Sequence, residues 1–165
     1  MKKIIIKGKR NIDGMKKEKN KKRKVTESVK NKNLFNKLSQ VEYLNKLFLD
    51  ENYDGIDFIK HELERKINGY KNQDVKKKIF SNEKFIKYEE CLEKLVISKL
   101  KCYYCRKDCL IAYENVREEK QWTLDRIDNS IGHNKENVVI CCLNCNLKRR
   151  TLNDEKFKFT KQMRI

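Results

Sequence analysis

The sequence predicts an α+β protein, in which a small strand-and-helix domain held by a four-cysteine zinc site follows a helical segment and a disordered basic tail. Three observations predict this fold class. Two Cys-x2-Cys pairs lie in the C-terminal half, apolar residues recur at helical spacing before them, and the N-terminus carries most of the excess positive charge. We therefore divide the chain into a tail (1–32), a helical N-terminal region (33–99) and a zinc-containing domain (100–165).

The N-terminal tail is strongly basic. Residues 1–30 contain thirteen Lys or Arg and three Asp or Glu, which is +10 of the net charge of +17. Few apolar residues follow Ile12, so we expect disorder, because the segment cannot bury enough surface to offset its ordering entropy. Nucleic acid is the partner that this charge indicates, since neutralised phosphates release counterions. A biased genome composition is the alternative explanation of the charge. The basic run 21–24 resembles a nuclear-import signal.

Long apolar segments are absent from the sequence. The apolar run that starts at Ile4 ends before Lys7, which is too short for a secretory signal, and no stretch approaches the roughly 18 residues of a membrane span. We therefore expect an intracellular protein of the cytoplasm or nucleus, including that of a cell infected by a virus or phage. We expect no membrane partner and no small-molecule cofactor.

Three apolar stripes predict three helices. The first starts with Asn33 as N-cap; its apolar residues are Leu34, Phe35, Leu38, Val41, Leu44, Leu47 and Phe48. The second stops at Asn68 and Gly69; its stripe is Ile56, Ile59, Leu63 and Ile67. The third has Asn82 as a candidate cap and leads into the first cysteine pair; its stripe is Phe85, Ile86, Leu92, Leu95, Val96 and Leu100. We expect a helical cover without chemistry, and a surface position for His61.

The cysteine pairs have the spacing of zinc ligands. In each pair two thiolates can reach two corners of one tetrahedron around Zn²⁺; the predicted ligands are Cys102, Cys105, Cys142 and Cys145. Disulfides are the alternative, and the charge-rich composition and expected reducing compartment argue against them. Cys141 could replace Cys142 in a Cys-x3-Cys arrangement. Cys109 is left over, and Cys91, on a helical stripe, fits a small buried apolar residue.

The 36 residues between the pairs, 106–141, have room for a hairpin. The segments 109–113 and 121–127 are rich in β-formers and predict two antiparallel strands, with Trp122 and Leu124 facing the core. A turn-rich loop follows at 128–136, where Gly132 is able to take a positive φ.

A helix is expected from about Leu143, so that the chain order is strand, strand, helix. The i, i+4 spacing would turn Leu143 and Leu147 inward, and would place Asn146, Arg149 and Arg150 on another face.

A family resemblance rests on four groups of residues: 124–129, Gly132 with His133, 137–139, and Cys142 to Lys148 with Asn146 after the last cysteine. This pattern, which covers about residues 100–155, resembles the zinc-containing HNH endonuclease family, including phage- and virus-type members with an Asp-Arg-Ile-Asp-Asn box. The resemblance implies a ββα-metal fold, and hydrolysis of phosphodiester bonds in DNA that leaves 3′-hydroxyl and 5′-phosphate ends.

The resemblance also implies roles for individual residues. Asp125 and Asn146 would bind one catalytic divalent cation, Asn137 would fix the loop by hydrogen bonds, and the four cysteines would hold a structural zinc. Oxygen ligands suit a hard cation such as Mg²⁺ or Mn²⁺. The nucleic-acid contacts that we expect come from basic side chains near this site; they are Arg126, Lys148, Arg149 and Arg150.

One position departs from the family pattern. The usual general base is a histidine directly after the aspartate, and here that residue is Arg126, which stays protonated at neutral pH. Arg126 is better suited to gripping phosphate or stabilising the transition state. His133 is the other imidazole nearby and a candidate base; its alternative is a ring that packs in the loop. Further candidates that can also be packing residues are Tyr103, Tyr104 and Tyr113.

These features favour an HNH-type, metal-dependent DNA endonuclease. Its partner is expected to be DNA rather than RNA. The first alternative is a catalytically silent zinc-containing module that binds DNA or RNA, and Arg126 favours it. The second is a structural protein whose helices dock a partner, which the charge of +17 disfavours.

Overall fold

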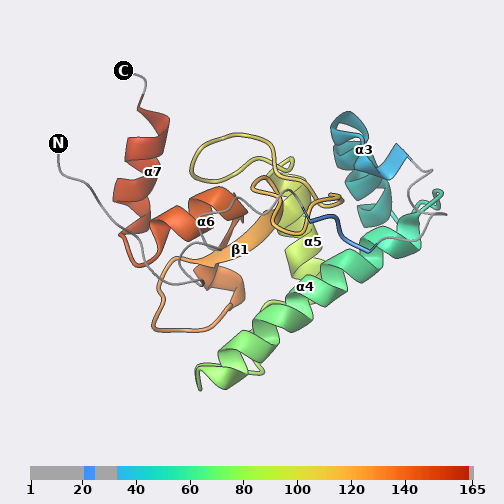
Figure 1. Ribbon diagram of the computed structural model, residues 1–165. Coiled ribbons are helices and arrows are strands. Elements are labelled where there is room, and N and C mark those ends of the chain that lie inside the picture. The colour runs from blue at the N-terminus through green and yellow to red at the C-terminus, as the bar shows by residue number, and fades with distance from the viewer. Residues whose placement is uncertain (1–20, 25–32, 164–165) are drawn as a thin grey trace, which may run out of the picture.

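The computed structural model describes residues 21–24 and 33–163, and the chain there is a mixed helix and sheet protein. The elements in chain order are η1 (Asn33–Phe35), α3 (Lys37–Phe48), α4 (Ile56–Lys76), α5 (Tyr88–Ile97), β1 (Trp122–Arg126), η2 (Lys135–Asn137), β2 (Val138–Cys142), α6 (Leu143–Arg149) and α7 (Asp154–Gln162) (Figure 1). The two strands form an antiparallel sheet.

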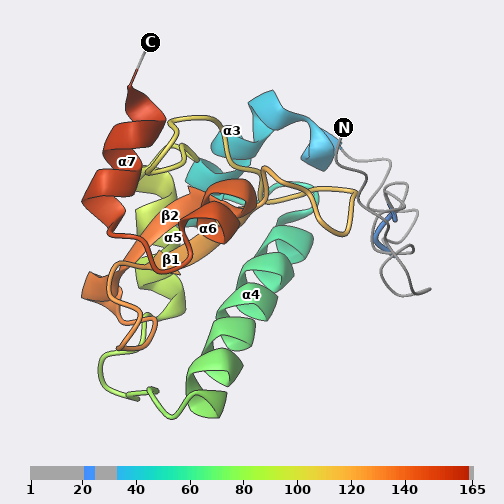
Figure 2. The ribbon, with the colours of Figure 1, turned by 60° about the vertical axis from the view of Figure 1, so that its left-hand side comes forward.

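The sheet lies between helices. α6 covers one side of it and α5 the other, while the long helix α4 runs past the sheet (Figures 1 and 2). Covered in this way, all five residues of β1 are buried. The core therefore joins the sheet to the three N-terminal helices, and its buried members include Leu44, Leu63, Leu95, Trp122 and Ile140.

The first and third helices begin later than the sequence predicts. Asn36, rather than Asn33, caps α3 by accepting a hydrogen bond from the backbone N–H of Leu38. The side chain of Leu38 is 86% exposed, so it lies outside the buried stripe. The N-cap of α5 is Lys87 rather than Asn82, and Glu90 accepts a hydrogen bond from its backbone N–H. In both cases a cap nearer the helix satisfies the free N–H groups.

Helix α4 does not stop at Asn68 and Gly69, as the sequence predicts, but continues to Lys76. One glycine costs a helix only about 1 kcal/mol, and the additional turns make tertiary contacts. Tyr70 accepts a hydrogen bond from the backbone N–H of Leu124 in β1 at 3.0 Å. Asp74 is buried against the loop that follows β1. His61, as expected, lies on the exposed side of the helix.

The expected hairpin between 109–113 and 121–127 is wrong. β1 pairs instead with β2, with Trp122 opposite Cys142 and Arg126 opposite Val138. The segment 109–113 makes only one parallel bridge, through Leu110.

Gln40 of α3 explains why 109–113 forms no strand. Its side-chain oxygen accepts hydrogen bonds from the backbone N–H groups of Ile111 and Ala112, and its amide nitrogen donates to the carbonyl of Ala112. One buried side chain therefore takes the place of a neighbouring strand. The expected burial of Trp122 and Leu124 is confirmed.

Helix α6 faces differently from the prediction. Leu147 is 63% exposed, whereas Arg149 is buried with 1% of its surface exposed. A buried guanidinium is stable only when its donors are paired, and three acceptors surround this one: the Asp125 carboxylate and the carbonyl oxygens of Arg126 and Leu152.

Part of the basic tail is ordered. Residues 21–24 lie against the body of the protein, where Arg23 forms a salt bridge with buried Glu62 at 2.8 Å and its guanidinium lies 4.5 Å from the ring centre of Tyr113. The prediction of disorder is wrong for this run, and for the rest of the tail it lies outside the described residues. In the parts of the chain that are described, no helix is both long enough and apolar enough to cross a membrane.

Candidate functional site

Four cysteines form a group that could hold a metal ion such as zinc. The Sγ atoms of Cys102, Cys105, Cys142 and Cys145 all lie within 4.8 Å of one another. Cys105 Sγ and Cys142 Sγ are 3.9 Å apart, close to the ~3.8 Å edge of a tetrahedron with Zn–S bonds of about 2.3 Å. The expected ligand set is therefore brought together, and all seven cysteines of the chain are free of disulfides.

Backbone bonds hold the two cysteine pairs in place. Tyr103 donates its backbone N–H to the carbonyl of Ile140 at 2.9 Å, which ties the first pair to β2. The alternative ligand Cys141 points elsewhere, since its Sγ lies 3.2 Å from the hydroxyl of Thr123. Cys91 is fully buried in the core, as expected for a small apolar residue.

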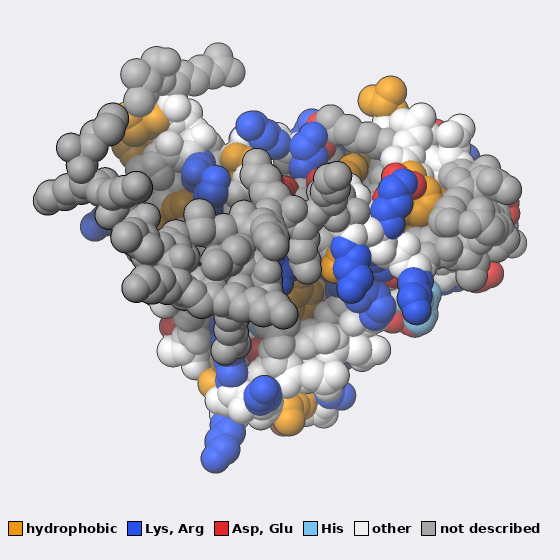
Figure 3. Space-filling model, viewed as in Figure 1, with side chains coloured by type: hydrophobic (Ala, Val, Ile, Leu, Met, Phe, Trp, Pro, Cys, Tyr) orange, Lys and Arg blue, Asp and Glu red, His pale blue; other side chains and the backbone are white. Residues whose placement is uncertain are grey.

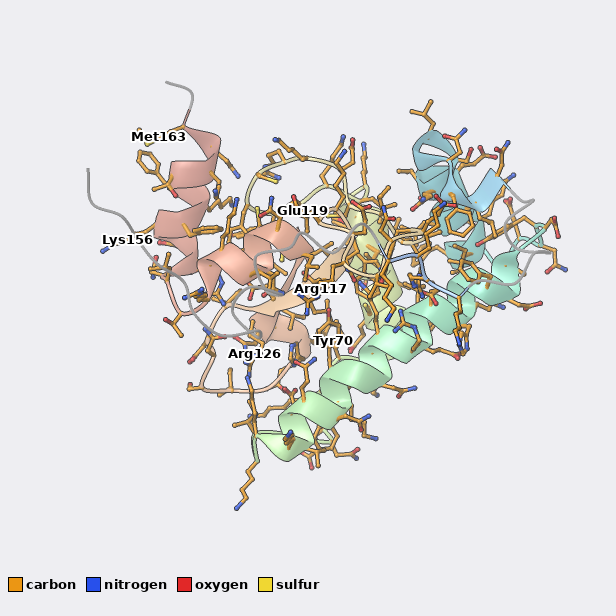
Figure 4. The ribbon with its side chains drawn as sticks, viewed as in Figure 1. Tyr70, Arg117, Glu119, Arg126, Lys156 and Met163 are labelled. Carbon is orange, nitrogen blue, oxygen red and sulfur yellow. The ribbon has the colours of Figure 1, made fainter. Side chains whose placement is uncertain are left out.

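A cleft of about 930 Å³ opens between α4, β1 and α6. The expected residues Asp125, Arg126, His133, Asn146 and Arg150 line it together. Helix α4 and its C-cap supply the other wall, whose lining residues are Arg65, Lys66, Gly69, Tyr70, Gln73 and Lys77. Figure 4 shows Tyr70 and Arg126 in the region where α4 faces the end of β1.

The cleft is basic. Among the residues that the structure describes, five Lys or Arg side chains line it against one acidic residue, Asp125: the basic ones are Arg65, Lys66, Lys77, Arg126 and Arg150. Lys and Arg side chains are also spread over the face of the molecule seen in Figure 3. Lys148, expected to contact nucleic acid, is exposed but does not line the cleft. A polyanion is the ligand that such a lining favours.

Asp125 lies in the cleft and accepts hydrogen bonds through both of its carboxylate oxygens. Its Oδ2 accepts hydrogen bonds from the hydroxyl of Tyr104 at 2.6 Å and from Nε of Arg149 at 2.5 Å, and its Oδ1 accepts one from the same guanidinium at 3.0 Å. Arg149 therefore neutralises this carboxylate. Because Arg149 is buried and paired, it cannot bind phosphate in this conformation. This corrects the expectation that Arg149 contacts nucleic acid. Arg150 remains exposed.

Two asparagines form hydrogen bonds with β1 and with the loop that follows it. Asn137 is buried and fixes the loop after β1, since it donates to the carbonyls of Asp128 and Gly132 and accepts from the backbone N–H of Asp128. Asn146 of α6 donates through its amide nitrogen to the hydroxyl of Thr123 and the carbonyl of Leu124. Those bonds leave the amide oxygen of Asn146 for a ligand.

His133 is held by Asp74. Nδ1 of His133 lies 2.7 Å from Oδ1 of Asp74, and the backbone N–H of His133 donates to Oδ2 at 2.6 Å. The ring of Tyr70 lies against the imidazole, with 4.6 Å between ring centres. Burial lowers the pKa of His133 below its ordinary value, although Asp74 acts in the opposite direction.

Gly132 serves a different purpose from the one expected. It does not adopt a positive φ. A Cβ at this position would lie 2.7 Å from the carbonyl oxygen of Ile79 and 2.8 Å from Oδ2 of Asp74. The glycine therefore lets the Asp74 carboxylate approach the backbone of the loop.

Two of the candidate tyrosines are not bases at neutral pH. Tyr104 and Tyr113 donate their hydroxyls to Asp125 and Gln121, and burial raises the pKa of both. Tyr103 packs edge-on against Tyr104. Arg126 is buried, with 8% of its surface exposed, and donates to the carbonyl of Ile131.

Sequence reasoning missed the contribution of α4. Asp74, Tyr70 and Lys66 all reach the cleft or its histidine, although the helices were expected to carry no chemistry. Nζ of Lys66 donates to the carbonyl of Trp122 and lies 4.9 Å from the centre of that ring. Burial lowers the pKa of Lys66 to about 7. In the sequence, the available signal for this contribution was Asp74, a single acid among the lysines of 71–78. The end of a solvated helix shows the same pattern.

Comparisons with known proteins give one partial relative. No protein-family model matches the chain, and no solved structure matches it. Uncharacterized protein R423 of Acanthamoeba polyphaga mimivirus is 43% identical over 65 residues, which are 39% of this chain. The match spans 10% of the length of R423. The name of that protein assigns it no activity.

Proposed function

We propose that this chain is an HNH-type DNA endonuclease, which hydrolyses phosphodiester bonds with a divalent cation and leaves 3′-hydroxyl and 5′-phosphate ends. The arrangement that carries the proposal is the meeting of Asp125, Asn146 and His133 in one basic cleft. The order β1, β2, α6 agrees with the ββα core of that family, and the four-cysteine group agrees with its structural zinc.

The donor set at the cleft suits Mg²⁺ or Mn²⁺. Asp125 offers carboxylate oxygens and Asn146 an amide oxygen, which are the ligands that hard cations prefer. Of about four acceptor positions on a carboxylate, hydrogen bonds from Tyr104 and Arg149 use three on Asp125. The remaining acceptor position of Asp125 and the amide oxygen of Asn146 are therefore the protein oxygens that would hold a hard cation such as Mg²⁺.

Each residue in the cleft has a separate task in the proposed reaction. Asp125 and Asn146 would hold the cation, which when bound would stabilise the charge that develops on the phosphate and its leaving oxygen. His133 takes the proton of the attacking water. Arg126 and Arg150 hold the phosphates on either side of the cut with forked hydrogen bonds. The Tyr104 hydroxyl fixes the Asp125 carboxylate.

Cutting of supercoiled plasmid tests this proposal. Wild-type protein with Mg²⁺ or Mn²⁺ should give nicked or linear DNA, and EDTA should stop the reaction. Asn146→Ala should lower the rate by about 10²-fold or more, the scale of losing one group that stabilises the transition state. DNA binding, measured by fluorescence anisotropy without cleavage, should change little because Lys and Arg supply most of the affinity.

The matched control is Asn144→Ala. Asn144 lies on the same helix as Asn146 but outside the cleft, where its amide contacts Glu119. The Asn144→Ala variant should cut DNA at the wild-type rate. Asp125→Asn is a second variant that keeps the side-chain shape beside Arg149. Cutting by Asn146→Ala at the rate of Asn144→Ala would show that the cleft is not the active site.

The pairing of Asp125 with Arg149 favours a second candidate function. A carboxylate that is already neutralised attracts a divalent cation less strongly, which fits a catalytically silent zinc-containing module that binds DNA or RNA. That candidate predicts tight, salt-dependent binding with no cut DNA under any divalent cation. The plasmid assay and the anisotropy measurement together distinguish the two functions.

A further inference from the structure

We infer that Asp74 of α4 is a positioning residue for His133, whose imidazole it holds with a proton on Nδ1 and with Nε2 free to accept a proton in the cleft. The inference rests on the proposed function, because it assumes that His133 is the general base. It makes the long N-terminal helix part of the active site.

Two hydrogen bonds fix His133 on one carboxylate. Oδ2 of Asp74 accepts the backbone N–H of His133 at 2.6 Å, and Oδ1 lies 2.7 Å from its Nδ1. The His133 and Asp74 side chains are 5% and 1% exposed. Gripped at both backbone and ring, the histidine has little freedom to rotate.

The chemistry of the pair selects the tautomer. An ionised carboxylate only accepts hydrogen bonds, so the nitrogen that faces it must carry a proton. In a neutral imidazole the other nitrogen is then the acceptor. That nitrogen is Nε2 of His133, a residue that lines the cleft with Asp125 and Asn146.

Surrounding groups keep the imidazole in this position and neutral. The ring of Tyr70 covers it, and the Tyr70 hydroxyl is anchored on the backbone of Leu124. Arg126 and Lys77 are the cations that act on the ring, and both oppose its protonation. Asp74 is the acid that favours the charged form, and burial outweighs it.

The tautomer can be measured directly in the full chain. Long-range ¹⁵N–¹H NMR near neutral pH should report a protonated Nδ1 and an unprotonated Nε2 for His133. The chain has two histidines, so His61→Gln identifies the signals of His133. In Asp74→Asn the side-chain amide can donate to Nδ1, and the proton should move to Nε2. Wild-type protein with its His133 proton on Nε2 would overturn the inference, whatever its activity.

Activity then tests the consequence for catalysis. Asp74→Asn should lower kcat by about 10²-fold or more, as loss of a general base does, while KM for plasmid stays within about twofold. Asp57→Asn is the matched control, an exposed acid in the first turn of the same helix. Equal kcat values for the two variants would overturn the positioning role. A wild-type protein that cuts no DNA would overturn the proposed function, and the NMR measurement would still decide the tautomer.

Discussion

Replacement of Arg149 by Met should destabilise the protein by about 3–5 kcal/mol, the usual cost of breaking a buried ion pair by removing one partner. The guanidinium of Arg149 makes two hydrogen bonds to Asp125 and one each to the carbonyls of Arg126 and Leu152. Methionine fills similar space but leaves the buried carboxylate of Asp125 with Tyr104 as its remaining donor.

Urea unfolding followed by the fluorescence of Trp122 measures this loss. With an m-value of about 2 kcal/mol/M, the midpoint should fall by about 1.5–2.5 M. Arg150→Met is the control, because Arg150 is exposed on the same helix and such changes usually stay within about 0.5 kcal/mol. Metal content is compared in both variants, so that loss of zinc is not mistaken for loss of the ion pair.

Ligand binding gives the same experiment a second readout. Arg150→Met should weaken DNA binding and Arg149→Met should not, because only Arg150 faces solvent. Mn²⁺ should raise the stability of Arg149→Met more than that of wild type, since the cation can take the place of the guanidinium at Asp125. Equal urea midpoints for the two variants would refute the buried ion pair.

Three further outcomes are expected. About one zinc should copurify per chain, Cys142→Ala should lose it and Cys141→Ala should keep it, as measured by metal analysis; equal metal content in the two variants would contradict the ligand set. Because burial lowers the pKa of His133, the neutral ring contributes stability that is complete above about pH 6.5 and is lost as pH falls toward the lowered pKa. His133→Gln should flatten the dependence of the urea midpoint on pH between pH 7.5 and 5, and His61→Gln, at an exposed histidine, is the matched control substitution. Deletion of residues 1–20 should reduce the slope of log K for DNA against log salt by about 0.9 for each phosphate that this segment neutralises; an unchanged slope would mean that this segment does not bind DNA.

The features that were predictable from the sequence depend on short spacings. Two cysteines separated by two residues reach one metal ion in almost any chain context, and the structure brings both pairs together. The loop asparagine Asn137 lies within nine residues of both groups that it binds, Asp128 and Gly132. In each case the partners are close along the chain, so the pattern itself carries the geometry.

The missed features depend on contacts between distant segments. Three β-rich segments, 109–113, β1 and β2, compete for pairing. Gln40, which lies 71 residues before Ile111, binds the backbone of the first segment. Helical periodicity could not show that Arg149 turns inward, because its acceptor Asp125 is 24 residues away. Asp74 lies 59 residues before His133. A single sequence contains no signal that pairs such positions.

The predicted boundary between the helical region (33–99) and the zinc-containing domain (100–165) does not separate purely structural helices from the residues of the cleft. Hydrogen bonds cross it from Gln40 to Ala112, from Lys66 to Trp122, from Leu124 to Tyr70 and from His133 to Asp74. These bonds attach α3 to the segment before β1, and α4 to the first half of β1 and to the loop that follows it. If residues 100–165 contained the whole active site, substitutions on α4 would change stability alone. The contacts of Asp74 and the cleft wall formed by α4 instead predict that such substitutions also change catalysis, so the proposed activity should be tested with α4 present.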